Sequence, residues 1–159
     1  MVHMGCEKNP KAIGVVPWGG PGGNTWDDGT YDGVREITLI YGSCISTIQV
    51  IYDKNCKPVS GEKHGTNQGQ LHGTKTAQIK LRFPEEFLTT VTGHYALDRG
   101  LGTPVIRSLT FKTNQKTFGP YGVEEGTPFS FSMEGGKVVG FKGRSGWYMD
   151  AIGFHIVQA

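Results

Sequence analysis

Three pairs of strand-like segments, evenly spaced along the chain, constrain the fold more than any other feature of this sequence. In each pair apolar and polar residues alternate as they do in strands, and a glycine follows the first segment. These glycines stand at positions 42, 93 and 143, and this period of about 50 residues is typical of repeated supersecondary units. The pairs are residues 35–41 with 48–52, 87–92 with 105–111, and 137–142 with 151–157.

The glycine-rich stretches between these pairs hold further strands, at residues 76–83 and 128–132, so each repeat is predicted to contain four strands. No helical stripe exceeds two turns, and only Pro84–Glu86 suggests a short helical turn. We therefore predict an all-β fold with three four-stranded antiparallel sheets around one core and pseudo-threefold symmetry. An ordinary β-sandwich with coincidental glycine spacing is the alternative.

Length and charge narrow the classes of protein to consider. The 159 residues fit one domain, which we place at residues 13–159, after an N-terminal extension at 1–12 that we expect to be disordered. Met1–Met4 is interpreted as a cloning remnant. A net charge of +2 with mixed signs gives no basic stripe, so we expect no nucleic-acid partner.

The sequence contains neither a membrane-length apolar run nor a secretory pattern at its start. We expect no membrane insertion and a cytoplasmic or nucleocytoplasmic location. Cys6, Cys44 and Cys56 are an odd number, which favours free thiols, although a Cys44–Cys56 pair stays open. The histidines are scattered, so we expect no metal site and no cofactor.

The candidate functional residues lie in the turn of the third pair, between residues 143 and 152. A hexose presents hydroxyl pairs that donate and accept together, and an apolar C–H face. Asp150, the turn amides and the rings of Trp147 or Tyr148 could supply an acceptor, donors and an aromatic wall, and Gly146 would let the chain turn. The alternative is a hairpin turn that the aspartate merely caps.

Several segments, taken in order from Ile13 to Val157, resemble the jacalin-related lectins, and among them the uncleaved, mannose-specific, artocarpin-like type. The resemblance implies a β-prism I fold of three Greek-key sheets and non-catalytic binding of mannose, glucose and glycans or glycoproteins that contain them. It also implies a plant protein. The segments that carry it are residues 18–24, 26–29, 105–114, 118–122 and 139–153.

The resemblance also implies roles for individual residues. The Gly23 N–H would donate to the O3/O4 side of the sugar, the amides of Trp147 and Tyr148 to O5 and O6, and Asp150 would accept from O4 and O6. Gly146 opens the Gly-x-x-x-Asp run of this loop. The middle loop, residues 95–103, would flank the pocket and tune the preference for larger glycans, through Leu97, Asp98 and Arg99.

The resemblance also implies a sugar specificity and a number of sites per chain. Galactose-binding members are cut ahead of the segment that matches Gly23, whereas this chain reads through residues 21–25 without a processing linker, so we expect mannose or glucose over galactose. The first turn, residues 42–47, lacks the carboxylate of a second site, so one site per chain is expected. Because such sites bind monosaccharides weakly, we expect a homodimer or homotetramer.

Two other functions compete with sugar binding. A glycosidase would need a pair of carboxylates, for which Asp27, Asp28, Glu124, Glu125 and Asp150 are candidates, but they lack a clear set of catalytic partners. A protein-interaction scaffold could use an exposed Trp147.

The remaining aromatic residues are interpreted structurally. We expect Trp18 and Trp26 to pack beside the glycine loop. Core or sheet-face positions are expected for Tyr41, Tyr52, Phe111, Phe141 and Phe154. Asp27 also stands four residues after Gly23, but we expect this segment to open a strand.

Overall fold

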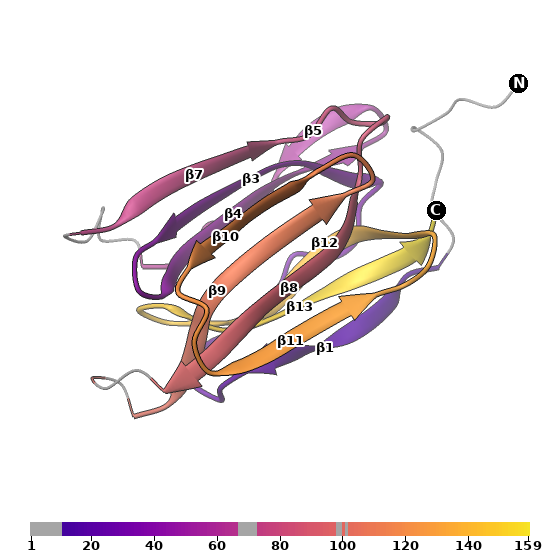
Figure 1. Cartoon of the computed structure of the whole chain (residues 1–159). Coiled ribbons are helices and arrows are strands. Elements are labelled where there is room, and N and C mark those ends of the chain that lie inside the picture. The colour runs from indigo at the N-terminus through magenta and orange to yellow at the C-terminus, as the bar shows by residue number, and fades with distance from the viewer. Residues whose placement is uncertain (1–10, 67–72, 98–99, 101) are drawn as a thin grey trace, which may run out of the picture.

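All regular structure in the described residues is β. The computed structural model describes residues 11–66, 73–97, 100 and 102–159, whose strands form three antiparallel sheets around a shared interior (Figure 1). The first sheet has the order β1-β13-β12-β2, with bounds Ile13–Gly19, Met149–Gln158, Gly136–Ser145 and Asn24–Asp27. The second has the order β10-β9-β8-β11, with bounds Thr117–Gly122, Pro104–Thr113, Leu88–Leu97 and Thr127–Ser132.

The third sheet is larger than predicted. Its order is β5-β4-β3-β7, with bounds Lys57–Ser60, Ile45–Lys54, Gly33–Tyr41 and Lys75–Lys80, and the two-residue β6 (His64–Gly65) also pairs with β4. The prediction of three sheets is confirmed, but four strands is correct for only two of them. Near Pro84 the chain makes a single turn in which the Glu86 amide donates to the Arg82 carbonyl.

The three predicted strand pairs correspond to the hairpins β3–β4, β8–β9 and β12–β13. The evenly spaced glycines, however, are not equivalent: Gly42 follows the last residue of β3, whereas Gly93 and Gly143 lie inside β8 and β12. A Cβ atom at Gly93 would lie 2.2 Å from the Ser108 carbonyl oxygen and 2.8 Å from the Phe129 ring. These glycines therefore allow close approach of a neighbouring strand and ring, and do not mark strand ends.

The core takes apolar side chains from every sheet, and the rings of Tyr52, Phe111, Phe141 and Phe154 are almost completely buried, as predicted. Tyr41 packs against this core while partly exposed. The Trp18 ring stacks on Phe129 with centroids 5.1 Å apart, which joins the first sheet to the second. Trp18 therefore packs between sheets, and its expected place beside the glycine loop stays a prediction.

A polar network joins the first sheet to the third. The Tyr52 hydroxyl donates to Asp28 Oδ2 (2.6 Å) and accepts from the Phe141 amide (3.1 Å), while His64 Nε2 lies 2.7 Å from Asp28 Oδ1. Trp26 stacks on the His64 ring with centroids 3.6 Å apart. Burial and the negative charge of Asp28 raise the pKa of Tyr52, so its hydroxyl stays a donor.

The cysteines differ in state. Cys44 is free and buried, and Cys56 is disulfide-bonded, so the expectation of free thiols is wrong for Cys56. The two do not pair with each other, because they flank opposite ends of the extended strand β4. At about 3.3 Å per residue, that strand separates them far beyond the 7 Å or so that a disulfide spans between Cα atoms.

In the described part of the chain, no helix has the length and apolar character that crossing a membrane requires. No group of three His, Cys, Asp or Glu side chains suited to a metal ion occurs there either.

Replacing Tyr52 with phenylalanine tests the polar network. Tyr52→Phe leaves a buried Asp28 oxygen and the Phe141 amide without their shared partner, so we expect the free energy of unfolding to fall by about 1–3 kcal/mol in urea denaturation. Tyr121→Phe is the control, since that hydroxyl makes no hydrogen bond within the described residues. Equal stability of the two variants would show that the network contributes nothing.

Candidate functional site

The candidate site forms where the two ends of the chain meet in the first sheet. Strand β1 pairs with β13 and β2 pairs with β12, so the chain between β1 and β2 crosses the end of the β12–β13 hairpin (Figure 1). In register, Gly19 lies opposite Ala151 and Asn24 opposite Ser145. The Gly20 amide donates to the Asp150 carbonyl at 2.8 Å, which fixes the start of this crossing. We call residues 20–23 the glycine loop.

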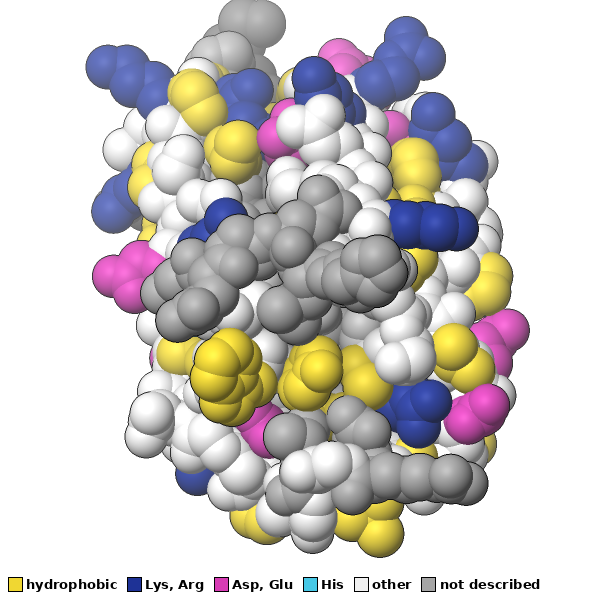
Figure 2. All heavy atoms as spheres, turned by 90° about the vertical axis from the view of Figure 1, so that its left-hand side faces the viewer, with side chains coloured by type: hydrophobic (Ala, Val, Ile, Leu, Met, Phe, Trp, Pro, Cys, Tyr) yellow, Lys and Arg dark blue, Asp and Glu magenta, His cyan; other side chains and the backbone are white. Residues whose placement is uncertain are grey.

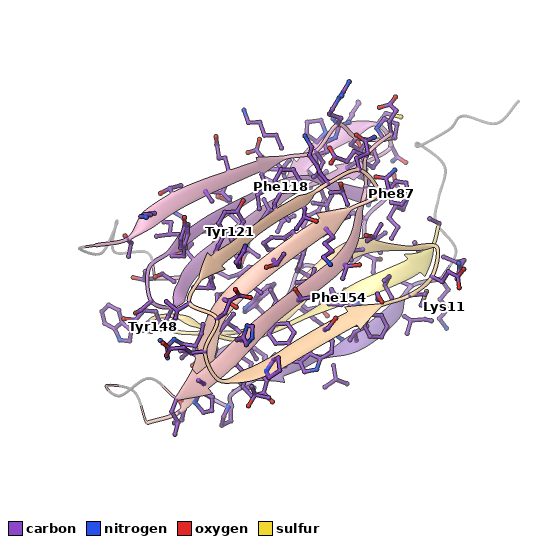
Figure 3. All side chains as sticks on the ribbon, in the orientation of Figure 1. Lys11, Phe87, Phe118, Tyr121, Tyr148 and Phe154 are labelled. Carbon is purple, nitrogen blue, oxygen red and sulfur yellow. The ribbon has the colours of Figure 1, made fainter. Side chains whose placement is uncertain are left out.

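A hollow of about 270 Å³ opens between the glycine loop and the β12–β13 turn, and we call it the Asp150 hollow. It lies at the end of the molecule opposite Lys11, where Figure 3 labels Tyr148. Figure 2 looks onto this end, across which hydrophobic side chains form a band. The hollow is lined by Gly22, Gly23, Thr103, Gly146, Trp147, Tyr148 and Asp150.

The structure thus places all five predicted sugar-binding residues around one hollow. Of the predicted flanking residues, Leu97 is exposed and is not part of the lining, while Asp98 and Arg99 lie outside the described residues. Thr103, from the same middle loop, lines the hollow instead. Sequence reasoning named neither Thr103 nor Gly22 individually, because only the folded backbone shows which residues of a loop face inward.

The glycine loop lies directly on the Asp150 carboxyl group. A Cβ atom at Gly23 would lie 2.4 Å from the Ser145 carbonyl oxygen and 2.7 Å from Asp150 Oδ1, and φ of Gly23 is +68°. A Cβ atom at Gly22 would lie 2.5 Å from Asp150 Oδ2. Glycine is therefore required at position 23, whereas at position 22 a side chain would displace the Asp150 carboxylate. Two glycines here let backbone amides and the carboxylate share one ligand.

Asp150 is 7% exposed, and its surroundings shift the pKa of its carboxyl group in opposite directions. Burial raises the pKa of the carboxyl group, while the charge of Arg144 and a hydrogen bond from the Gly146 amide lower it, and the net shift is upward. In its ionised form the carboxylate is a charged acceptor, which binds hydroxyl donors more strongly than a neutral acceptor does.

Trp147 supplies an apolar surface beside this acceptor. Its side chain is 59% exposed, and few other large hydrophobic side chains in the described residues are exposed. An aromatic ring at the rim of a polar hollow offers a face to the C–H groups of a ligand.

Two other hollows differ from this one in chemistry. A larger hollow of about 370 Å³ is lined by three carboxylates, those of Asp27, Asp28 and Glu62. Both oxygens of Asp28 already bind Tyr52 and His64, and Asp27 bonds His155 and the Gly29 amide. A third, of about 240 Å³, lies at the first hairpin turn next to Tyr148, and no carboxylate occurs among the described residues that line it. The Asp150 hollow differs from both because its carboxylate lies against the backbone of two glycines, although it is not the largest of the three.

The other carboxylates considered for catalysis lie elsewhere. Asp27 ends β2 and bonds His155 Nε2 at 2.8 Å, which agrees with its expected place in a strand. Glu125 is exposed and lies 3.5 Å from Arg107. Among the described lining residues of the Asp150 hollow, Asp150 is the one carboxylate.

Substitution of Gly23 tests the close packing of the glycine loop. Gly23→Ala forces a contact with the Ser145 carbonyl, so we expect a loss of at least about 2 kcal/mol in the free energy of unfolding. Gly29→Ala is the control, because Gly29 also has positive φ (+87°) but no described atom lies within 4 Å of the added carbon. It should cost only about 1 kcal/mol, from backbone strain. An equal cost for both variants would contradict the packing argument.

Comparison with known proteins agrees with this architecture. Residues 15–155 match the family described as "Jacalin-like lectin domain". Jacalin-related lectin 19 of Arabidopsis thaliana is 62% identical over 142 residues, which cover 89% of this chain and 78% of that protein.

Two solved structures are similar throughout. A mannose-specific jacalin-related lectin from Morus nigra, in complex with mannose, is 53% identical, has a TM-score of 0.86, and the match covers 95% of this chain and 97% of that one. Artocarpin in complex with mannotriose is 52% identical, has a TM-score of 0.86, and the match covers 92% and 98%. The three sheets therefore form the β-prism fold of these lectins, and the chain belongs to the jacalin-related lectin family, whose members bind carbohydrates.

Proposed function

We propose that the protein binds mannose or glucose, and glycans that contain mannose, in the Asp150 hollow, without catalysis. The observation that carries this proposal is the contact of the Asp150 carboxylate with the backbone of Gly22 and Gly23, beside the turn amides of residues 146–148. A charged acceptor and several main-chain donors within one shallow hollow suit a ligand that presents adjacent hydroxyl groups.

The chemistry assigns a role to each group. Asp150 accepts from two sugar hydroxyls, O4 and O6, the Gly23 amide donates to the O3/O4 side, and the amides of Trp147 and Tyr148 donate to O5 and O6. Each charge-assisted hydrogen bond contributes only about 1.5–3 kcal/mol after desolvation. A hollow of about 270 Å³ accommodates one hexose rather than a long chain. Monosaccharide affinity is therefore weak, and a homodimer or homotetramer would raise avidity for branched glycans.

Preference for mannose over galactose is supported by the continuity of the glycine loop. Residues 20–23 connect β1 to β2 without a break, so the nitrogen of Gly23 is a peptide amide and carries no charged α-amino group. The solved relative from Morus nigra is described as mannose-specific.

A purely binding role is supported by the distribution of carboxylates. Glycoside hydrolysis generally uses two carboxyl groups roughly 5–10 Å apart, on either side of the scissile bond. Asp150 has no carboxylate partner among the described residues that line its hollow, and Asp27 and Asp28 bond histidines elsewhere.

Removing the charge of Asp150 tests the proposal. Asp150→Asn keeps the shape of the side chain but replaces a charged acceptor, so we expect affinity for methyl α-mannoside to fall at least tenfold in titration calorimetry, from about 1.5–3 kcal/mol for each weakened bond. Asp27→Asn is a matched control because Asp27 also stands four residues after a glycine, yet it binds Gly29 and His155 away from the hollow. Full binding by the Asp150 variant would refute the proposal.

The pH dependence of binding gives an independent check. Burial raises the pKa of Asp150 above its ordinary value of 3.8, so the carboxylate becomes protonated at a higher pH than an exposed aspartate. We expect affinity to be constant near neutral pH and to fall by about tenfold per pH unit below that raised pKa. Calorimetry with the folded state monitored by circular dichroism measures this, and an affinity unchanged down to pH 3.8 would contradict the role of Asp150.

A further inference from the structure

Arg144 bonds the glycine loop from the neighbouring strand. It lies near the end of β12, and its Nε atom donates to the Gly22 carbonyl and its Nη2 atom to the Gly23 carbonyl, each at 3.0 Å. One planar guanidinium therefore holds two successive carbonyl groups, in the fork geometry that arginine offers and lysine does not. These bonds join positions 122 and 121 residues apart in the sequence.

The Gly22 carbonyl and the Gly23 N–H belong to the same peptide unit. Because a trans peptide is planar, its C=O and N–H point in opposite directions, so a carbonyl directed at Arg144 turns the Gly23 N–H away from the guanidinium. Two consecutive glycines have unusually free backbone torsions, so hydrogen bonds to this peptide unit restrict a rotation that side chains do not limit. The Arg144 bonds therefore fix the direction of the Gly23 amide, and Gly23 is one of the residues that line the Asp150 hollow.

The same guanidinium acts on Asp150. Its positive charge lowers the pKa of that carboxyl group and opposes the effect of burial, and it is the one charged side chain among the described residues that shifts this group. The Gly146 amide, on the turn, acts in the same direction through a hydrogen bond. Asp98 and Arg99 of the middle loop lie outside the described residues.

We propose that Arg144 is a positioning residue for sugar binding, which directs the Gly23 amide into the hollow and holds its positive charge near the Asp150 carboxylate without being part of the lining. This inference rests on the proposed function. It assigns Arg144 two separable effects, one of geometry and one of charge, and two substitutions separate them.

The experiment compares Arg144→Met, Arg144→Lys and Arg107→Met in calorimetric titrations with methyl α-mannoside across a range of pH. Arg144→Met removes the fork and the charge, so we expect affinity to fall about tenfold at neutral pH and the acid loss of binding to begin at a higher pH than in the parent protein. Arg144→Lys keeps the charge but not the fork. The pH at which binding is lost in acid should therefore return towards that of the parent protein, while the affinity at neutral pH stays reduced.

Arg107→Met is the matched control. Arg107 Nε also donates to the carbonyl of a hairpin turn, that of Ser43 at 2.8 Å, but Arg107 does not line the Asp150 hollow. This variant should keep both the affinity and the pH profile. Melting temperatures of all three variants report on folding. If Arg144→Met does not fold, the affinity of the Arg144→Lys variant still tests whether the fork geometry is needed for binding.

A measurement without sugar separates this inference from the proposed function. In nuclear magnetic resonance of the free protein, Arg144→Met should lower the order parameter of the Gly23 amide and raise the titration midpoint of the Asp150 carboxyl carbon. If a folded Arg144→Met protein keeps the parent's amide order, Asp150 titration and affinity, the proposal is overturned while mannose binding stands. If the parent binds no mannoside, the proposed function fails, and unchanged values in the free variant would also overturn the positioning role.

Discussion

Pairing of the first two strands with opposite edges of the last hairpin is the constraint on which the rest of the site depends. Once β1 lies beside β13 and β2 beside β12, the chain between them must cross the turn end of the hairpin within a few residues. That short crossing leaves no space for side chains at Gly22 and Gly23. The same constraint thus accounts for the glycines, for their contact with Asp150, and for the backbone donors beside a carboxylate.

Asp28 and Asp150 show how burial and partners give one residue type two roles. Both carboxylates are largely buried, but Asp28 binds Tyr52 and His64 inside the molecule, where its charge joins two sheets. Asp150 instead faces a hollow, with the nearby charge of Arg144 and the Gly146 amide partly offsetting the cost of burial. A buried charge without a ligand or partner is unfavourable, so a hydroxyl-rich ligand can satisfy Asp150 in a way that Asp28 does not require.

Much of the architecture could be predicted from the sequence, because strand alternation and turn glycines are local signals. The three hairpins, the buried aromatic residues and the five residues around the hollow all follow from such signals or from the resemblance to the family. The positions of Gly93 and Gly143 inside strands could not be predicted. At each position a carbonyl and an aromatic ring from other strands leave no space for a side chain.

Arg144 was missed for a similar reason. In the sequence it is one arginine before a turn, and its two bonds reach residues more than a hundred positions away, which only the register of β2 on β12 makes possible. The stacking of Trp26 on His64 and the state of Cys56 also depend on long-range placement. Local patterns therefore predict the elements and the residues on the turns, but not the contacts between distant segments that hold them in place.

The most direct test of the central claim is a crystal structure of the protein with methyl α-mannoside. The account predicts a hexose in the Asp150 hollow, with O4 and O6 within hydrogen-bond distance of the Asp150 carboxylate and the Gly23 amide directed at the O3/O4 side. A sugar bound elsewhere, or an Asp150 carboxylate turned away from a bound sugar, would contradict it.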